Sequence, residues 1–329
     1  MTRTAEPASF AARVEAATPA AREREVDGLR GLAILGVILG HWLVTAFVAS
    51  GHGELAVASP LHYLPGLAPV SWVFQTLAVF FLVGGYTGAK GWKGRAYGEW
   101  LRRRMLRLAR PIPLLVLAWV PLTLALVAAG VRPVGEVLKL VVSPLWFLAV
   151  YAVLTALTPA AVALWRHLGG WAVTLPVGMV AAVDLVRFGL SGPHWPGWVN
   201  LPAGWLVPYL LGVGWAAGAF RTSRAAWWLL CGGALATALL IRYGGYPASM
   251  VGVPGAAISN LNPPSLAAVA FGLAQAGLAL LLRRPRVWAP VALVNLSAMT
   301  LFLWHQRIPL GYFFCQCFSP DPDLRLVAC

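Results

Sequence analysis

The sequence predicts an all-α fold, a polytopic bundle of about nine or ten transmembrane helices, and three observations support this prediction. Of the 329 residues, 59% are hydrophobic, where soluble domains have roughly 45–50%. Charged residues make up 11%, against about 25% in soluble domains. The apolar residues form unbroken runs of about 20, the length of a membrane-spanning helix, whereas β-barrel strands alternate over about ten residues. An ordinary soluble domain, a disordered protein and a disulfide scaffold are therefore excluded.

The chain begins with a polar stretch. Residues 1–26 are rich in Ala, Arg and Glu and lack the apolar core of a signal peptide. We expect a cytoplasmic N-terminal tail or short surface helix here. A single transmembrane domain over residues 27–329 should follow, because no linker divides the remaining sequence.

The apolar runs define the expected spans, each of a length that can cross the bilayer core. The last run is long, and Pro309 is expected to bend it. In order along the chain, the expected spans are Leu29–Ala49, Ala68–Ala89, Pro111–Gly130, Leu145–Trp165, Trp171–Leu190, Val199–Phe220, Ala225–Ile241, Leu266–Leu282 and Trp288–Phe314.

The charges set the expected orientation. With a cytoplasmic N-terminus, the large majority of the 25 Lys and Arg fall in segments on the inner side, as the positive-inside rule requires. This bias accounts for most of the net charge of +14 without a nucleic-acid partner. Most of the 16 Trp fit an interfacial aromatic belt that contacts membrane lipid. Four Cys are too few for a disulfide framework, and we expect no metal site.

Polar and ionisable side chains are costly inside a membrane span, so each one is a candidate for function. Few are placed there: His41, Asp184, Arg187, Gln275, Asn295, His305 and Arg307.

Arg30 and His41 belong to one face of the first expected helix. Eleven residues separate them, which corresponds to about 1100° of helix rotation, some 20° from whole turns, and to roughly 16 Å along the axis. Arg30 should therefore lie at the cytoplasmic interface, with His41 past the middle of the membrane. Gly36 and Gly40 on this helix allow another helix or a ligand to approach closely.

This arrangement suggests a reaction. A cytosolic donor that carries phosphate could bind Arg30 through charge-assisted hydrogen bonds, with its long arm along the helix face. A desolvated imidazole tends to stay neutral, and a neutral His41 could take a proton from a hydroxyl as a general base. The alternative is that His41 only hydrogen-bonds a carbonyl group of a neighbouring helix.

Several motifs, in order along the chain, resemble those of the acyltransferase 3 family of bacterial membrane O-acyltransferases. The family's Arg, ten residues, His pattern is met at Arg30 and His41. The further matches are Phe80 to Tyr86, the Arg-x-x-Arg motif at Arg104 and Arg107 or at Arg107 and Arg110, Pro144 to Leu148 with Trp146, and Leu301 to His305.

The resemblance implies transfer of an acyl group from a donor such as acyl-CoA to a hydroxyl of a glycan or small metabolite. It implies His41 as the essential histidine, Arg30, Arg104, Arg107 and Arg110 on the donor side, and a multi-pass protein of the cell membrane. No cofactor is expected, because acyl-CoA is a co-substrate. Trp146, Asp184, Asn262 and His305 are candidates for the acceptor or a second site.

The sequence departs from the family in two respects. The family usually has about ten spans and nine are counted here, so the prediction includes a bundle without a last helix. No glutamate lies in a late span to partner the histidine. Asp184 could take this place, although pairing with Arg187, three residues on, is the simpler reading. Asn262 likewise has a plainer reading, as part of a turn.

A transporter of a small anionic or lipid-linked substrate is the alternative function, because it could use the same arginines. Transporters often contain inverted repeats, and no repeat is visible in this sequence. An isoprenoid diphosphate enzyme would need carboxylate clusters to hold Mg²⁺, which the spans lack.

Overall fold

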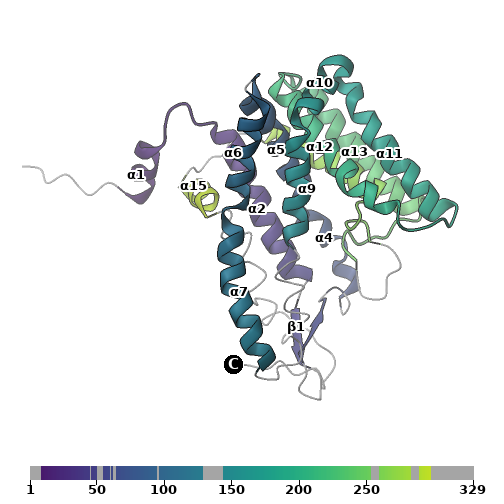
Figure 1. Ribbon diagram of the computed structural model, residues 1–329. Helices are drawn as coiled ribbons and strands as arrows, with labels where there is room; N and C mark the ends of the chain where they lie inside the picture. The colour runs from purple at the N-terminus through teal and green to yellow at the C-terminus, as the bar shows by residue number, and fades with distance from the viewer. Residues whose placement is uncertain are drawn as a thin grey trace, which may run out of the picture.

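The computed structural model describes residues 9–44, 46–49, 55–59, 61, 64–94, 96–128, 144–252, 259–282 and 289–297. These residues form a helical bundle with one small β-hairpin (Figure 1). The longer elements are α1 (Phe10–Ala17), α2 (Arg24–Val44), α5 (Leu77–Trp92), α6 (Tyr97–Ala109), α7 (Pro111–Ala128), α9 (Pro144–Ala156), α10 (Thr158–Leu168), α11 (Thr174–Asp184), α12 (Gly197–Ala216), α13 (Ser223–Tyr243), α14 (Leu266–Leu281) and α15 (Ala289–Leu296). The shorter elements are β1 (Ala46–Ala49), β2 (Leu55–Ala58), η1 (Pro65–Leu67), α4 (Val70–Val73), η2 (Gly169–Val173) and η3 (Leu185–Gly189).

The all-α membrane fold predicted from the sequence is confirmed. Five helical stretches among the described residues are long and apolar enough to cross a membrane: Arg24–Val44, Val70–Trp92, Tyr97–Ala125, Thr158–Gly189 and Ser223–Tyr243. The ninth expected span is described only over α15, and the bend expected at Pro309 lies outside the described residues. Each of the other expected spans coincides with at least one helix, but the fourth is divided into α9 and α10 at Leu157. Pro159 explains this division, because proline is favoured in the first turn of a helix and disfavoured in its interior.

The first expected span is shorter than predicted. Helix α2 ends at Val44, and the chain then enters strand β1, so the predicted continuation to Ala49 is wrong. β1 pairs with β2 in antiparallel register, with Ala46 opposite Ala58 and Ala49 opposite Leu55. An apolar run of this length does not distinguish the end of a helix from a strand, because periodicity is the same for both when every residue is apolar.

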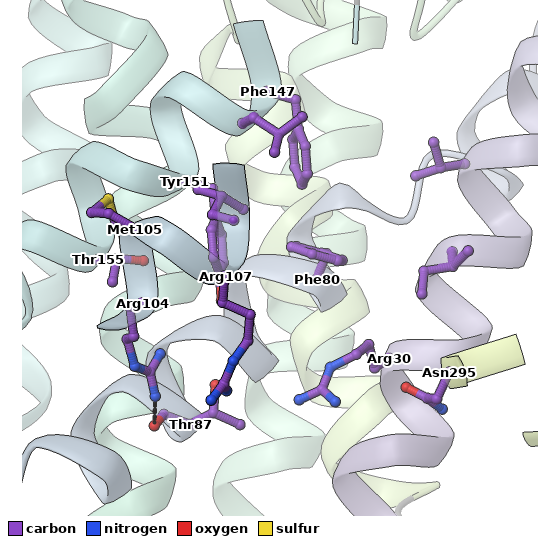
Figure 2. Close-up of a pocket in the computed structure, with 14 residues that line it drawn as sticks. Arg30, Phe80, Thr87, Arg104, Met105, Arg107, Phe147, Tyr151, Thr155 and Asn295 are labelled. Carbon is purple, nitrogen blue, oxygen red and sulfur yellow. Dashed lines mark hydrogen bonds between the residues drawn. The ribbon is translucent and has the colours of Figure 1, made fainter. Parts of the chain in front are cut away.

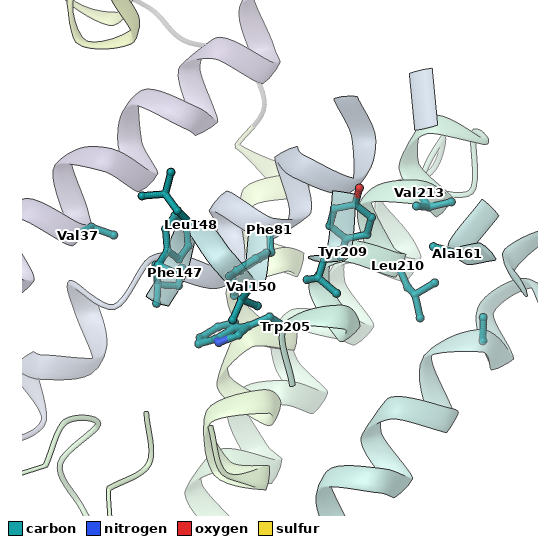
Figure 3. Close-up of a cluster of buried hydrophobic side chains, with 14 of the residues drawn as sticks. Val37, Phe81, Phe147, Leu148, Val150, Ala161, Trp205, Tyr209, Leu210 and Val213 are labelled. Atoms are coloured by element: carbon teal, nitrogen blue, oxygen red, sulfur yellow. The ribbon is translucent and has the colours of Figure 1, made fainter. Parts of the chain in front are cut away.

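Helices α5 and α12 form the centre of the bundle and pack in direct backbone contact. A Cβ added to Gly85 would collide with the carbonyl oxygen of Tyr209, and one added to Gly212 would collide with that of Leu82. Small residues at such crossings let two membrane helices approach closely. Next to this contact, the ring of Phe81 stacks on Trp205 at 5.2 Å in the main hydrophobic cluster (Figure 3).

Helix α2 packs against the start of α5 through its glycines. The hydroxyl of Thr76 donates a hydrogen bond of 2.7 Å to the carbonyl of Ala33. Thr76 also fills the space beside Gly36, while Phe74 lies against Gly40. The sequence allowed either another helix or a ligand to approach Gly36 and Gly40. In the structure, residues just before α5 lie beside both glycines.

Asp184 connects four elements of the bundle. Its carboxylate accepts hydrogen bonds from Asn200 on α12 at 3.0 Å, from the hydroxyl of Tyr246 at 2.9 Å and from the backbone N–H of Leu266 at 2.7 Å. Arg187 lies 3.9 Å away as its ion-pair partner, as the sequence favoured. Burial and the neighbouring carboxylate raise the pKa of Tyr246, so its hydroxyl remains a donor. These contacts join α11 to α12, to α14 and to the segment that contains Tyr246.

Candidate functional site

The first cavity of the site has a volume of about 360 Å³ and is called the Arg30 cavity below. Helices α2, α5, α6, α9 and α15 each contribute to its wall (Figure 2). Its lining residues are Arg30, Ile34, Val37, Phe80, Thr87, Arg104, Met105, Arg107, Leu108, Phe147, Leu148, Tyr151, Thr155 and Asn295. Figure 2 shows the guanidinium groups of Arg30, Arg104 and Arg107 at one end and the ring of Phe147 at the other, so the cavity is cationic at one end and apolar at the opposite end.

Two of these arginines are held in place by other groups. Asp27 accepts a hydrogen bond of 2.9 Å from Arg30 and another of 2.6 Å from Arg22. The guanidinium of Arg104 donates to the carbonyl of Thr87 at 2.5 Å and lies over the ring of Trp100 at 5.1 Å. Both side chains are therefore oriented before any ligand binds, which lowers the entropic cost of binding an anion.

A smaller pocket shares Arg104 and Arg107 with the Arg30 cavity and is called the Trp100 pocket below. It has a volume of about 260 Å³ and is lined by Gly91, Glu99, Trp100, Arg103, Arg104 and Arg107. Arg104 and Arg107 line both this pocket and the Arg30 cavity, as expected for the donor-side motif. Arg110 lies at the exposed end of α6 and lines neither the Arg30 cavity nor the Trp100 pocket, so its donor role stays a prediction.

Asn295 brings an amide into the Arg30 cavity from α15. Its Nδ2 donates to the carbonyl oxygens of Asp27 at 2.7 Å and Val291 at 2.9 Å. Its Oδ1 is buried and has no hydrogen-bond partner among the described residues. A buried acceptor without a partner is costly, so this atom is suited to accept an N–H group of a ligand.

The second cavity holds the histidine and is called the His41 cavity below. It has a volume of about 210 Å³ and is lined by Val37, Gly40, His41, Val44, Ser71, Phe74, Gln75, Leu77, Trp146, Phe147, Val251, Leu261 and Asn262. His41, Trp146 and Asn262, which the sequence proposed separately, therefore meet in one place. Asn262 follows Leu261 at the turn where the sequence expected one.

The imidazole of His41 is fixed by its own helix. Its Nδ1 lies 2.8 Å from the carbonyl oxygen of Val37, and a carbonyl can only accept, so Nδ1 carries the proton. In a neutral imidazole, Nε2 is then the basic nitrogen. The sequence left open that His41 only hydrogen-bonds a carbonyl group of a neighbouring helix. In the structure, the carbonyl group that it contacts belongs to α2, the helix that carries His41.

The two cavities adjoin each other. Val37 and Phe147 line both of them, so each of these side chains contacts the Arg30 cavity and the His41 cavity. Along α2, Arg30, Ile34 and Val37 line the first cavity, and Val37, His41 and Val44 line the second. The face of α2 that joins Arg30 to His41 is therefore lined by cavity throughout.

Two candidates remain. Asp184 lines neither the Arg30 cavity nor the His41 cavity, and its carboxylate makes packing contacts, so its role at a second site stays a prediction. His305 lies outside the described residues. Sequence reasoning assigned no role to Asp27, and it noted Asn295 only as a polar residue within a span.

Comparison with known proteins gives one result. A family model of acyltransferase 3, described as an acyltransferase domain, matches residues 23–322. No curated protein sequence and no solved structure matches the chain.

Proposed function

The chain belongs to the acyltransferase 3 family, and from this premise we propose that it moves an acyl group from cytosolic acyl-CoA to a hydroxyl of a glycan or small metabolite. One observation carries the proposal: a cationic cavity and a histidine cavity adjoin along a single face of α2. The chain would cross the cell membrane several times, with Arg30, Arg104 and Arg107 on the cytosolic side.

The donor would bind with its phosphates at the arginines. Arg104 and Arg107 line both the Trp100 pocket and the Arg30 cavity, so one phosphate group can reach the two side chains together. The long arm of the donor would then follow α2 past Ile34 toward Val37. The Oδ1 of Asn295, which has no hydrogen-bond partner within the described part of the chain, is a suitable acceptor for an amide N–H of that arm.

The histidine would act as general base. Nε2 of His41 removes the proton from the acceptor hydroxyl, whose oxygen attacks the thioester carbonyl carbon and forms the new C–O bond. The C–S bond breaks as the tetrahedral intermediate collapses, and the departing thiolate takes the proton from the imidazolium. The products are an ester and free CoA, and the histidine returns to its initial state.

The acceptor would approach from the His41 cavity. The ring of Trp146 offers an apolar surface to a sugar or other ring, and Asn262 and Gln75 offer amide groups for its hydroxyls. These side chains come from segments far apart in the sequence and share the cavity with His41.

Turnover by the purified protein tests the proposal. The protein in lipid nanodiscs is given acetyl-CoA that carries label in the acetyl group, together with a panel of glycan and small hydroxyl acceptors. We expect time-dependent release of free CoA and transfer of the label to an acceptor. Binding of acetyl-CoA without cleavage of the thioester would contradict the enzymatic function and favour a transporter.

Arg30→Ala is expected to weaken binding of CoA by about tenfold or more, because a hydrogen bond to a charged group contributes roughly 1.5–3 kcal/mol. Isothermal titration of CoA into the protein in nanodiscs measures this change. Arg24→Ala is the matched control, since Arg24 belongs to the same helix but pairs with Glu15 and lines neither cavity. Equal CoA affinity in Arg30→Ala and the wild type would refute the donor role.

A further inference from the structure

The two side chains shared by the cavities are nearly fully buried. Val37 is 7% exposed and Phe147 is 5% exposed, and each lines both the Arg30 cavity and the His41 cavity. They come from different helices, α2 and α9. The boundary that the two cavities share is therefore formed by one aliphatic and one aromatic side chain.

Phe147 is held in place by other aromatic rings. The ring of Phe80 packs edge-on against it with centroids 4.9 Å apart, and Phe81 does so at 5.2 Å. Tyr151, one helical turn further along α9, stacks at 6.5 Å. Figure 2 shows Phe147 at the end of the cavity opposite the arginines, and Figure 3 shows it beside Val37 and Leu148. Because rings packed on several sides have little freedom to move, the ring of Phe147 keeps a fixed position at the boundary of the two cavities.

Val37 is joined to His41 through its backbone. Its carbonyl accepts the hydrogen bond from Nδ1 of His41, one helical turn further along α2. Any reacting group that reaches His41 from the Arg30 cavity must pass the side chain of Val37 first. The histidine itself lines only the second of the two cavities.

We propose that Val37 and Phe147 form a constriction that selects donors with short, unbranched acyl groups. This inference rests on the proposed function and adds the class of acyl group. The acyl group precedes the sulfur of the donor, so it must pass the constriction before the thioester carbonyl can reach His41. A straight chain of few carbons passes between the two side chains, whereas a branch next to the carbonyl contacts both.

The size of the His41 cavity supports the same conclusion. Its volume of about 210 Å³ lies below the roughly 300–1,000 Å³ typical of ligand pockets. It must hold both the acyl group and the hydroxyl-bearing part of the acceptor when they react. A long acyl chain would occupy the space that the acceptor needs.

Binding of non-cleavable donors tests the constriction without knowledge of the acceptor. The probes are ketone analogues of acetyl-, butyryl- and isobutyryl-CoA, in which a methylene replaces the sulfur, and CoA itself is the internal reference. We expect the wild type in nanodiscs to bind the acetyl analogue at least tenfold more tightly than the branched isobutyryl analogue, with the straight-chain butyryl analogue between the two. In Phe147→Leu and in Val37→Ala, this difference should shrink by about tenfold, because each methylene in an apolar site changes selectivity by about 10- to 200-fold.

Phe220→Leu is the matched control. Phe220 is buried in a different hydrophobic cluster and lines neither cavity. It therefore loses similar packing and should keep the wild-type preference for the acetyl analogue. The second variant, Val37→Ala, removes fewer atoms and tests the constriction even where Phe147→Leu fails to fold.

The outcomes separate the two proposals. A wild type that binds CoA with no preference among the analogues, or variants that bind CoA and retain the full preference, would overturn the constriction alone. A wild type that does not bind CoA would overturn the proposed function and the constriction together. A reduced preference in Phe147→Leu and Val37→Ala, with the preference intact in Phe220→Leu, would establish the constriction.

Discussion

Replacement of His41 with alanine is expected to lower the rate of acyl transfer by a factor of about 100 to 10,000, the range that general-base groups contribute. The loss follows from the position of the imidazole, whose Nδ1 donates to Val37 and whose Nε2 is the basic nitrogen. Donor binding should persist, because the arginines line a different cavity.

Three measurements separate a catalytic from a structural role. Release of CoA from acetyl-CoA gives the rate, and titration with CoA gives the donor affinity of the same preparation. Added imidazole should restore part of the rate in His41→Ala, because a free base can occupy the space that the side chain leaves. His167→Ala serves as the control, since His167 is exposed at the end of α10.

Two results would contradict the general-base role. One is a rate within about threefold of the wild type in a folded His41→Ala protein, well below the loss expected for a general base. The other is a joint loss of CoA affinity and rate, without rescue by imidazole, which would mean that His41 only supports the fold.

The α2 part of the site could be predicted because it is a property of one helix. Residues that repeat at helical spacing share a face, so Arg30 and His41 had to point in similar directions whatever surrounded them. The structure places Ile34 and Val37 between them on the same cavity-lined face. The cost of a polar group in a membrane span identified His41 independently.

The rest of the site depends on contacts between distant segments, and no local pattern encodes them. Phe147 and Val37 line the same two cavities from α9 and α2, which are far apart in the sequence, and Asn295 enters the Arg30 cavity from the opposite end of the sequence. Asp27 lies in the first turn of α2, where an acidic residue is common and indicates no site by itself. In the structure it orients Arg30 and also binds Arg22.

Asp184 shows why a rule for membrane spans identifies important residues without naming their role. The rule that buried ionisable groups mark function selected it correctly as unusual. Its partners then decide what it does, and they come from α12, α14 and the segment that contains Tyr246. The sequence could show only the partner three residues away, Arg187.

Asp184→Ala is expected to destabilise the protein by about 3–5 kcal/mol, the cost of removing one member of a buried ion pair. Arg187 is 10% exposed, and its Nε and one terminal nitrogen have no hydrogen-bond partner among the described residues. Without the carboxylate, this charge stays buried and unpaired. The hydroxyl of Tyr246 and the N–H of Leu266 also lose their acceptor.

The thermal midpoint in detergent, followed by tryptophan fluorescence, measures the loss. Glu15→Ala is the matched control, because the pair of Glu15 with Arg24 is exposed and should contribute no more than about 1 kcal/mol. Asp184→Asn should fall between the two, since its amide oxygen keeps one acceptor while the charge is lost. If Asp184→Ala kept the wild-type midpoint but lost acyl transfer, its role would be at the reacting groups, and the assignment to packing would be wrong. If the thermal midpoint fell and acyl transfer declined in proportion to the unfolded fraction, the carboxylate would act only by holding α11, α12 and α14 together.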